Sequence, residues 1–501
     1  MTDTVKAPAA DGRETTTMLD ETRYEVVIGL EVHAQLLTRS KMFCGCSAEY
    51  AGAPPNTHVC PICLGMPGTL PVINKRAVEA TIMTGLALQS AIPEASKFDR
   101  KNYPYPDLPK GYQISQYDMP FCKGGVVEVE ADGQVRRVGM NRVHLEEDTA
   151  RLTHGPGGSL LDFNRSGAPL MEIVSEPDLR SPAEARAYLQ KLRSILRTLG
   201  VSTGNMEEGS FRCDANCSLR PVGAVEYGAK VEVKNMNSFR SVQRAIEFEI
   251  QRQTQILREG GQIAQETRGW VEERGVTVSQ RSKEQAHDYR YFPEPDLPPI
   301  FVSREWVSDL ASRLPELPDA KRGRFAREYG LSEYDAAQLA ADSATSRFFE
   351  RALALGSNPK TVANWMQSEL FRLLNDSNQT LEQSKATPEH LVEALALVEQ
   401  STISGSLARP VFEQSFRSGT SPKAIVAERG LAQVSGESEL DPLIAVALAA
   451  NPAAVADYRA GKASAINFLK GQVMKATRGQ ANPSVVEKLL RARLEAEGSP
   501  D

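Results

Sequence analysis

Four of the seven cysteines form two close pairs, Cys44-x-Cys46 and Cys60-x-x-Cys63. Two thiolate pairs separated by a short loop supply the four ligands of a tetrahedral zinc ion, so the spacing predicts a zinc knuckle over residues 44–63. Four protein ligands leave no coordination position open, which favours a structural zinc. The alternative is four unrelated cysteines in a reduced core. The remaining cysteines have no such spacing and are interpreted as core thiols: Cys122, Cys213 and Cys217.

Carboxylates and histidines in several separate segments form a second set that could do chemistry. Glu31 and His33 alternate with apolar residues within residues 24–37, which predicts that both project from one face of a strand. If other acids converge on this face, the set could bind Mg²⁺, which prefers oxygen ligands and keeps waters for substrate phosphates. The alternative is a group of solvated surface acids. The further candidates are His144, Glu146, Glu147, Asp148, Glu172, Glu176, Glu207, Glu208 and Asp214.

Four segments have basic character suited to phosphate or nucleic acid. Residues 99–118 and 280–296 interleave basic and aromatic side chains, which could hold phosphates and stack on bases; packed tyrosines in proline-rich loops are the alternative. Lys234 precedes a predicted helix N-terminus, which is either an anion site or an ordinary cap. Residues 459–483 are either an RNA footprint or a solvated helix face. The basic residues of the segment 459–483 are Arg459, Lys462, Lys470, Lys475 and Arg478.

The elements that must position these residues mix strands and helices without a regular βαβ rhythm, which predicts an α+β fold for residues ~20–295. Alternation predicts the strands, an Asp-Gly turn predicts a hairpin, and a capping box with proline at the first helical position starts one helix. The predicted elements are strands at 24–37 and 229–234, a hairpin at 126–138 with an Asp132-Gly133 turn, a helix from Ser181 to Gly200, and a helix at about 239–257.

The chain has 501 residues, which at about 150 residues per domain corresponds to about three domains. A proline-rich connector at 293–299 marks one boundary, and the sequence after it is rich in alanine, leucine and glutamate with helical spacing. The expected parts are a disordered tail at 1–20, an α+β domain at 21–296, an all-helical domain at 297–420 and a small helical domain at 421–501.

Composition and missing motifs exclude several classes of protein. With 58 Lys and Arg against 64 Asp and Glu, the net charge of −6 excludes a histone-like basic coat. No stretch approaches the ~20 apolar residues of a membrane span, and the N-terminus has no apolar signal region, so we expect a cytoplasmic protein without membrane contact. Because the P-loop, the kinase glycine-rich loop and G-x-G-x-x-G are all absent, any ATP site must be unusual.

From about residue 23 to 497 the sequence resembles the GatB family, the B subunits of aspartyl/glutamyl-tRNA amidotransferases. The matching segments include IGLEVHAQL, KNYPYPDLPKGYQISQYD, RVHLEEDTA, DFNRSGAPLMEIVSEPDLRSP, MEEGSFRCDANCSLRP, KNMNSFRSV, DYRYFPEPDLPP and GQVMKATRGQANP. The resemblance implies a cradle domain on a mainly antiparallel sheet with helices, then a helical domain, then a YqeY-like tail that contacts tRNA. It also implies two partners, the amidase GatA and the small subunit GatC.

The activity that the resemblance implies is an ATP-dependent ligase reaction that forms a carbon–nitrogen bond. The family phosphorylates the side-chain carboxylate of misacylated Glu-tRNA(Gln) or Asp-tRNA(Asn) with Mg-ATP, and ammonia from GatA then displaces the phosphate. The cofactors implied are ATP and Mg²⁺, with zinc as a structural addition that some members lack. A non-catalytic tRNA-binding scaffold is the alternative function.

The resemblance also assigns roles to residues of this sequence. Glu31, His33, Glu147 and Asp214 correspond to Mg²⁺ ligands, while Lys101 and Arg212 correspond to cations for phosphate charge. Alternation through Val143 and Leu145 would instead place Glu146 beside His144, whereas the family match favours Glu147. The complete expected catalytic and nucleotide-binding set is Glu31, His33, Lys101, Glu147, Glu172, Glu208, Asp214, Arg212 and Lys234.

Overall fold

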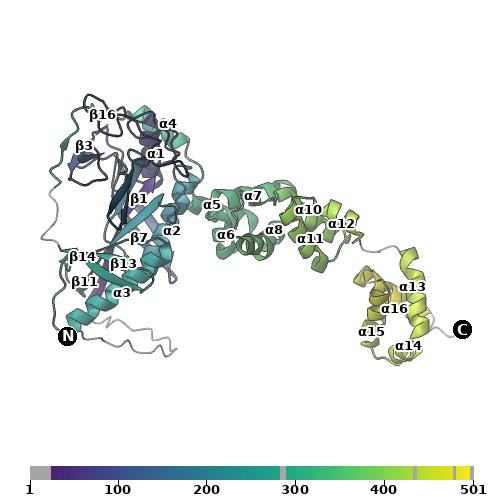
Figure 1. Cartoon of the computed structure of the whole chain (residues 1–501). Helices are drawn as coiled ribbons and strands as arrows, with labels where there is room; N and C mark the ends of the chain where they lie inside the picture. Colours follow the sequence, from purple (N-terminus) through teal and green to yellow (C-terminus); the bar gives the residue numbers. More distant parts are fainter. Residues whose placement is uncertain (1–23, 283–288, 433–436, 478–480, 497–501) are drawn as a thin grey trace. The chain divides into compact units, whose positions relative to one another are not determined.

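The computed structural model describes residues 24–282, 289–432, 437–477 and 481–496 (Figure 1). The chain divides into two compact units, Met1–Leu317 and Pro318–Asp501. The tail predicted at 1–20 lies outside the described residues. Residues 283–288 of the basic and aromatic stretch at 280–296 also lie outside them.

Within the described residues, nine strands of the first unit form one sheet in the order β14-β13-β12-β11-β1-β10-β7-β5, and β6 pairs with β7. All neighbours are antiparallel except β12 and β13, which confirms the predicted α+β class and mainly antiparallel sheet. The strands are β1 (Tyr24–Gln35), β5 (Cys122–Lys123), β6 (Val126–Ala131), β7 (Gln134–Glu147), β10 (Pro169–Ser175), β11 (Phe211–Pro221), β12 (Val231–Lys234), β13 (Glu266–Val271) and β14 (Val276–Ser282).

Three small sheets accompany the large one. β15 (Phe292–Pro293), β3 (Asp99–Asn102) and β4 (Tyr112–Ser115) pair side by side, so the two basic and aromatic stretches of the sequence meet in space. Arg100 strengthens this pairing, because its guanidinium donates two hydrogen bonds of 2.7 Å to the Glu294 carboxylate. The other pairs are β2 (Ala95–Ser96) with β16 (Ile300–Phe301), and β8 (Arg151–Gly155) with β9 (Gly158–Asp162).

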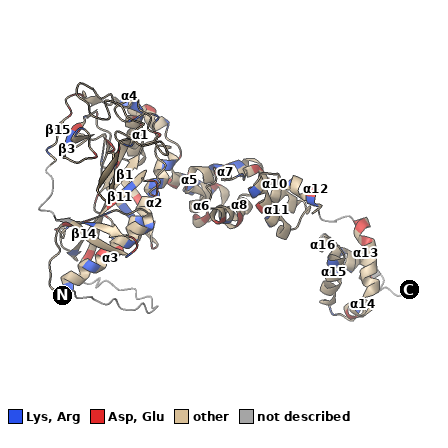
Figure 2. Ribbon diagram, viewed as in Figure 1, with Lys and Arg blue, Asp and Glu red and all other residues tan. Residues whose placement is uncertain are grey.

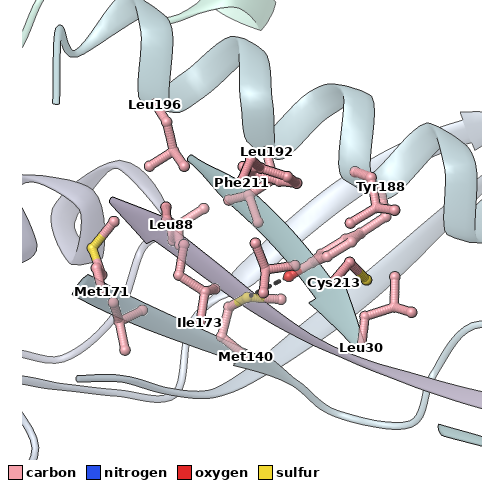
Figure 3. Packing of buried hydrophobic residues seen from close by; sticks show 14 of the residues in the cluster. Leu30, Leu88, Met140, Met171, Ile173, Tyr188, Leu192, Leu196, Phe211 and Cys213 are labelled. Carbon is pink, nitrogen blue, oxygen red and sulfur yellow. Dashed lines mark hydrogen bonds between the residues drawn. The ribbon is translucent and has the colours of Figure 1, made fainter. Parts of the chain in front are cut away.

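Helices cover the apolar face of the large sheet. They are α1 (Lys75–Ala87), α2 (Pro182–Thr198) and α3 (Phe239–Arg258), whose buried side chains join one cluster with the inward residues of the strands. In Figure 3, Tyr188, Leu192 and Leu196 of α2 lie over Leu30 and Ile173. Each fully buried leucine of this layer contributes about 1.5–3 kcal/mol to stability. Because this face is apolar, the alternate residues of the same strands form the polar face.

Local sequence signals fix where these elements begin and end. Ser181 Oγ accepts a hydrogen bond of 3.1 Å from the Glu184 N–H and starts α2, and Ser238 caps α3 in the same way. Asp132 and Gly133 both have positive φ, 52° and 73°, as a two-residue hairpin turn requires. The predicted hairpin, strands and helices of this region are therefore confirmed.

A buried charge network fixes α3 to the edge strands of the sheet. Glu249 is fully buried, and its carboxylate accepts a hydrogen bond of 2.9 Å from Arg252 and forms an ion pair with Arg268 Nε at 3.1 Å. The Thr277 hydroxyl of β14 also donates to Glu249. Removing one partner from such a network would leave a buried charge uncompensated, so it holds α3, β13 and β14 in one arrangement.

The second unit is built of helices. Residues 297–317, expected in the helical domain, belong to the first unit, where α4 (Arg304–Ser312) packs on α1. The helices that follow are α5 (Pro318–Tyr329), α6 (Glu333–Ala340), α7 (Ser343–Ala354), α8 (Pro359–Trp365), the π-turn η2 (Met366–Leu370), α9 (Phe371–Ser377), α10 (Pro388–Glu399), α11 (Gly405–Ser418), α12 (Pro422–Arg429), α13 (Glu437–Ala450), α14 (Pro452–Arg459), α15 (Ala465–Ala476) and α16 (Pro483–Ala496).

The last four helices have a hydrophobic cluster of their own, with Leu440, Leu469 and Leu490 fully buried. Among the described residues, no single helix has the length and apolar character to cross a membrane, although α13 and α14 meet these criteria together as a pair bent by 90°.

Candidate catalytic site and metal knuckle

Strand register brings distant acids and histidines together on the polar face of the sheet. His33 of β1 lies opposite Glu172 of β10 on one side and Arg212 of β11 on the other. Glu31 lies opposite Asp214, two residues away on the same face. Since strand side chains alternate, this register places all five side chains on the face that the helices leave uncovered.

The centre of this face is a cluster that we call the acid–histidine cluster, composed of His33, His144, Glu146 and Glu172. His33 Nε2 lies 3.4 Å from the Glu172 carboxylate and 3.8 Å from that of Glu146. His144 Nε2 lies 3.2 Å from Glu172. One ligand atom from each of His33, Glu146 and Glu172 falls within 4.8 Å of the others, which is close enough to hold one metal ion.

Mutual electrostatics perturb these groups strongly. Burial disfavours the charged imidazole of His144, but the carboxylates of Glu172 and Glu146 outweigh it and raise its pKa to about 9. Burial, together with the charges of Glu172 and Asp214, raises the pKa of Glu31. Buried groups that shift one another in this way are typical of active sites.

The structure places Glu146, and not Glu147, in the acid–histidine cluster. Alternation continues through the end of β7, so Glu147 points to the other side, where its carboxylate pairs with Lys110 and accepts from the Ile114 N–H at 3.0 Å. The family-based expectation of Glu147 as a ligand beside His33 is therefore corrected by geometry. The alternation of the sequence had indicated Glu146.

Three cations flank the cluster. Lys101 lies under the Tyr289 ring, 4.9 Å from its centre, and although burial opposes its charge, Glu146 and Glu172 raise its pKa. Lys234 Nζ pairs with Asp214 at 2.5 Å and with Glu232 at 3.1 Å. Arg212 donates to Asp148 at 2.7 Å. All three expected cations thus lie on or over the polar face.

Glu208 does not join this group. It is exposed in the turn before β11, and the ion pairs found around His33 in the described residues do not involve it. Asn216 was missed by the sequence analysis, yet its Nδ2 donates to Glu31 Oε1 at 3.2 Å. The signal was present, because Asn216 has the same strand parity as Asp214 in FRCDANC.

The four cysteines of the predicted knuckle do converge. The Sγ atoms of Cys44, Cys46, Cys60 and Cys63 all lie within 4.8 Å of one another. A hydrogen bond from Cys44, the Cys60 backbone N–H and the nearby charge of Lys41 lower the pKa of Cys63 to about 4. Four convergent sulfurs, one of them already favoured as a thiolate, fit a tetrahedral zinc ion. Cys122, Cys213 and Cys217 are buried elsewhere in the core, as expected.

A fully buried lysine accompanies the cysteines. Lys41 Nζ donates to the carbonyl oxygens of His58 at 2.7 Å and Phe163 at 3.4 Å, and lies 3.7 Å from Cys63 Sγ. A buried ammonium requires a compensating negative charge. Four thiolates around one divalent ion have a net charge of two minus, so Lys41 is placed to balance the loaded cluster.

An α+β domain that combines perturbed acids, histidines and three cations on one open sheet face has the features of a catalytic domain. Comparison with known families agrees: the model described as the GatB/GatE catalytic domain matches residues 26–308, and the YqeY-type GatB domain matches 347–494. The chain belongs to the GatB family.

Curated relatives match almost end to end. The chain is 57% identical over 477 residues to the B subunit of the aspartyl/glutamyl-tRNA(Asn/Gln) amidotransferase of Thermomicrobium roseum, covering 94% of this chain and 99% of the relative. The proteins of the same description from Roseiflexus castenholzii and Carboxydothermus hydrogenoformans are 56% and 54% identical. These alignments cover 95% and 94% of this chain, and 100% and 99% of the two relatives.

The first prediction concerns the metal in the knuckle. Substituting Cys44→Ser should lower bound zinc from one ion per chain to none, because three remaining sulfurs cannot complete the tetrahedral site. Elemental analysis of the purified protein measures this. The control Cys122→Ala removes a buried thiol of the core and should keep its zinc. Equal zinc in both variants, or none in the unsubstituted protein, would contradict the assignment.

The second prediction concerns Lys41. Substituting Lys41→Met keeps the length of the side chain but removes its charge, so the thiolate cluster loses its counter-ion. We expect zinc affinity to fall by about 10–100-fold, the usual effect of removing a group that supports metal ligands. Competition with a chromophoric chelator measures this affinity. The exposed Lys123→Met variant is the control, and an unchanged affinity in Lys41→Met would exclude the role.

Proposed function

We propose that this chain is the subunit that activates and amidates the side chain of misacylated Glu-tRNA(Gln) or Asp-tRNA(Asn). The carboxylate oxygen attacks the γ-phosphorus of ATP, the bond to the β-phosphate oxygen breaks, and ADP leaves. Ammonia then attacks the acyl carbon, the carbon–oxygen bond breaks, and phosphate leaves with the amide formed. The similarity to curated B subunits of this description, which extends over nearly the full length of the chain, supports the proposal.

The observation that carries the proposal is the acid–histidine cluster with its flanking cations. His33, Glu146 and Glu172 would hold Mg²⁺, with Glu31 and Asp214 next to them on the same face. Mg²⁺, when bound, would neutralise charge on the phosphate oxygens. Phosphoryl transfer needs chiefly positioning and charge neutralisation, for which Lys101, Arg212 and Lys234 are the available cations. The catalytic and ligand roles expected for Glu147 and Glu208 are not proposed.

The proposed partners follow from the chemistry. An acyl phosphate is hydrolysed by water, so ammonia should be produced and delivered within a complex rather than from solution. We propose that a separate amidase, GatA, produces this ammonia, with GatC as the third subunit of the complex.

The proposed domain roles assign catalysis to the first unit and tRNA contact to residues 421–501. Acidic residues gather at the start of α13, whereas α15 and its neighbours hold most of the bases (Figure 2). Lys462 and Lys470 are paired with Asp457 and Glu487, and Arg478 lies outside the described residues. On α15, exposed Phe468 and Lys475 would remain for stacking and phosphate contact.

The third prediction tests the catalytic cluster. Glu146→Gln should reduce ATP-dependent amidation by about 100-fold or more, because a carboxylate facing the reacting phosphates is lost. Glu31→Ala and His33→Ala should abolish amidation as well. Affinity for tRNA should stay within a few-fold in all three variants. Amidation is followed with labelled misacylated tRNA in the assembled complex.

The neighbouring substitution Glu147→Gln is the matched control for Glu146→Gln. It should mainly lower thermal stability, because Lys110 loses its buried partner, while the amidation rate stays within about ten-fold. If Glu31, His33 and Glu146 variants all amidate normally, the chain is a tRNA-binding scaffold. If Glu147→Gln alone is inactive, Glu147 is the Mg²⁺ ligand, as the family resemblance implied.

The fourth prediction concerns the C-terminal helices. Deleting residues 425–501 should mainly raise KM for aminoacyl-tRNA and leave kcat nearly unchanged, because the deletion removes phosphate contacts but no catalytic group. Steady-state kinetics at two salt concentrations measure both KM for aminoacyl-tRNA and kcat. An unchanged KM would remove the RNA role from this region.

A further inference from the structure

Asp148 is a buried carboxylate that directly follows β7, and its side chain is only 2% exposed. Its Oδ2 atom accepts hydrogen bonds from Arg212 Nη2 at 2.7 Å and from Gln35 Nε2 at 2.9 Å. Its Oδ1 atom accepts a hydrogen bond of 2.9 Å from the Thr149 N–H. Because both oxygens have donors, the carboxylate is fixed in one orientation.

Two arginines approach this carboxylate, and they are held differently. Arg165 Nε lies 3.7 Å from Asp148 Oδ2, but Arg165 donates to backbone carbonyl oxygens, those of Thr149 at 2.9 Å and Ala150 at 2.8 Å. Arg212 donates to Asp148 itself, and its side chain is 37% exposed. A guanidinium has five N–H donors, so Arg212 can be anchored at Asp148 and still present donors to a ligand.

Arg212 also lies close to the acids that would hold a metal. It is opposite His33 in the register of β1 and β11. Burial opposes the charge of Arg212, and the carboxylates of Asp148 and Glu146 raise its pKa. Without its partner at Asp148, the guanidinium would be drawn to Glu146, the nearby acid of the acid–histidine cluster. Arg212 would then compete with a metal ion for this carboxylate.

We propose that Asp148 is a positioning residue, whose carboxylate holds Arg212 ready for the reacting phosphate and away from Glu146. Phosphoryl transfer depends on cations that are already in place where negative charge develops, so an arginine that turns to another acid loses its effect. The inference rests on the proposed function, because it takes phosphate as the group that Arg212 contacts. Asp148 acts only through Arg212 and does not touch the substrate.

The support of Asp148 extends to the cysteine knuckle. Gln35 is the last residue of β1, and its Nε2 donates both to Asp148 and, at 2.7 Å, to the hydroxyl of Tyr50. Tyr50 lies between Cys46 and Cys60 in the knuckle. The Gln35 amide is thus held from two sides, so β1 and the knuckle both contribute to the orientation of Asp148.

A double-mutant cycle in the assembled complex tests this inference. Asp148→Asn keeps the shape of the side chain but removes its charge, and should lower kcat for ATP-dependent amidation by about 10–100-fold, as misplacement of a catalytic group does. Arg212→Met should lower kcat by about 100-fold. The double variant should be no slower than Arg212→Met, because Asp148 acts through Arg212. Melting temperatures confirm that each variant is folded.

A second readout does not require turnover. Mn²⁺ binding, measured by electron paramagnetic resonance without ATP, reports the metal affinity of the acid–histidine cluster. Asp148→Asn should weaken this binding by about ten-fold, because Arg212 then pairs with Glu146. In the Arg212→Met background the same substitution should have no effect, since no guanidinium is left to compete.

Asp99→Asn is the matched control. Asp99 is 1% exposed, pairs with Lys97 and accepts a hydrogen bond of 3.0 Å from the Tyr117 N–H, so it is another buried aspartate with a cationic partner. Its substitution should lower the melting temperature but leave kcat and Mn²⁺ affinity unchanged.

The outcomes separate the inference from the proposed function. The inference is overturned if the effects of Asp148→Asn persist in full in the Arg212→Met background, or if Asp148→Asn behaves like Asp99→Asn. A normal kcat in Arg212→Met would overturn it as well. Absence of ATP-dependent amidation in the wild-type complex would instead refute the proposed function.

Discussion

The two-residue period of β1 is the constraint on which the site depends. Leu30, Val32 and Ala34 are buried against the helices, so Glu31 and His33 are held on the opposite face without room to turn away. A register slip of one residue would bury the charges and expose the apolar side chains. The core therefore does more than stabilise the domain, because it fixes which side chains form the cluster.

The negative charges of the buried acids are offset by cations on the same face of the sheet. Buried acids of the cluster lie beside Lys101 and Lys234, and each cation has its pKa raised by the acids that face it. A cluster of several carboxylates and histidines is costly to bury unless cations offset it. The same cations are available to phosphate, so a structural need and a catalytic need are met by the same side chains.

In the cysteine knuckle, too, a buried cation lies beside groups that carry negative charge. Lys41 and the four sulfurs form a compact charged unit, and Gly167 lies against it: a side chain there would approach Cys63, Lys41 and Glu147. The Gly167 backbone accepts a hydrogen bond of 2.7 Å from the Met42 N–H and donates one of 2.9 Å to the Asp148 carbonyl oxygen. These bonds join the knuckle region to the end of β7, from which Glu146 reaches the acid–histidine cluster. A structural metal site can thus help to position a catalytic strand without taking part in the reaction.

The sequence alone determined the features that depend on local spacing. Alternation predicted β1 and the shared face of Glu31 and His33, the capping serine and the Asp-Gly turn predicted element ends, and Cys44 to Cys63 predicted the knuckle. Only the tertiary structure decided which distant groups meet. The pairing of β3 with β15, the meeting of His33 with Glu146 and Glu172, and the burial of Lys41 beside Cys63 all depend on register and contacts between segments far apart in the chain. Local sequence does not encode that register, because it results from packing the whole apolar face at once.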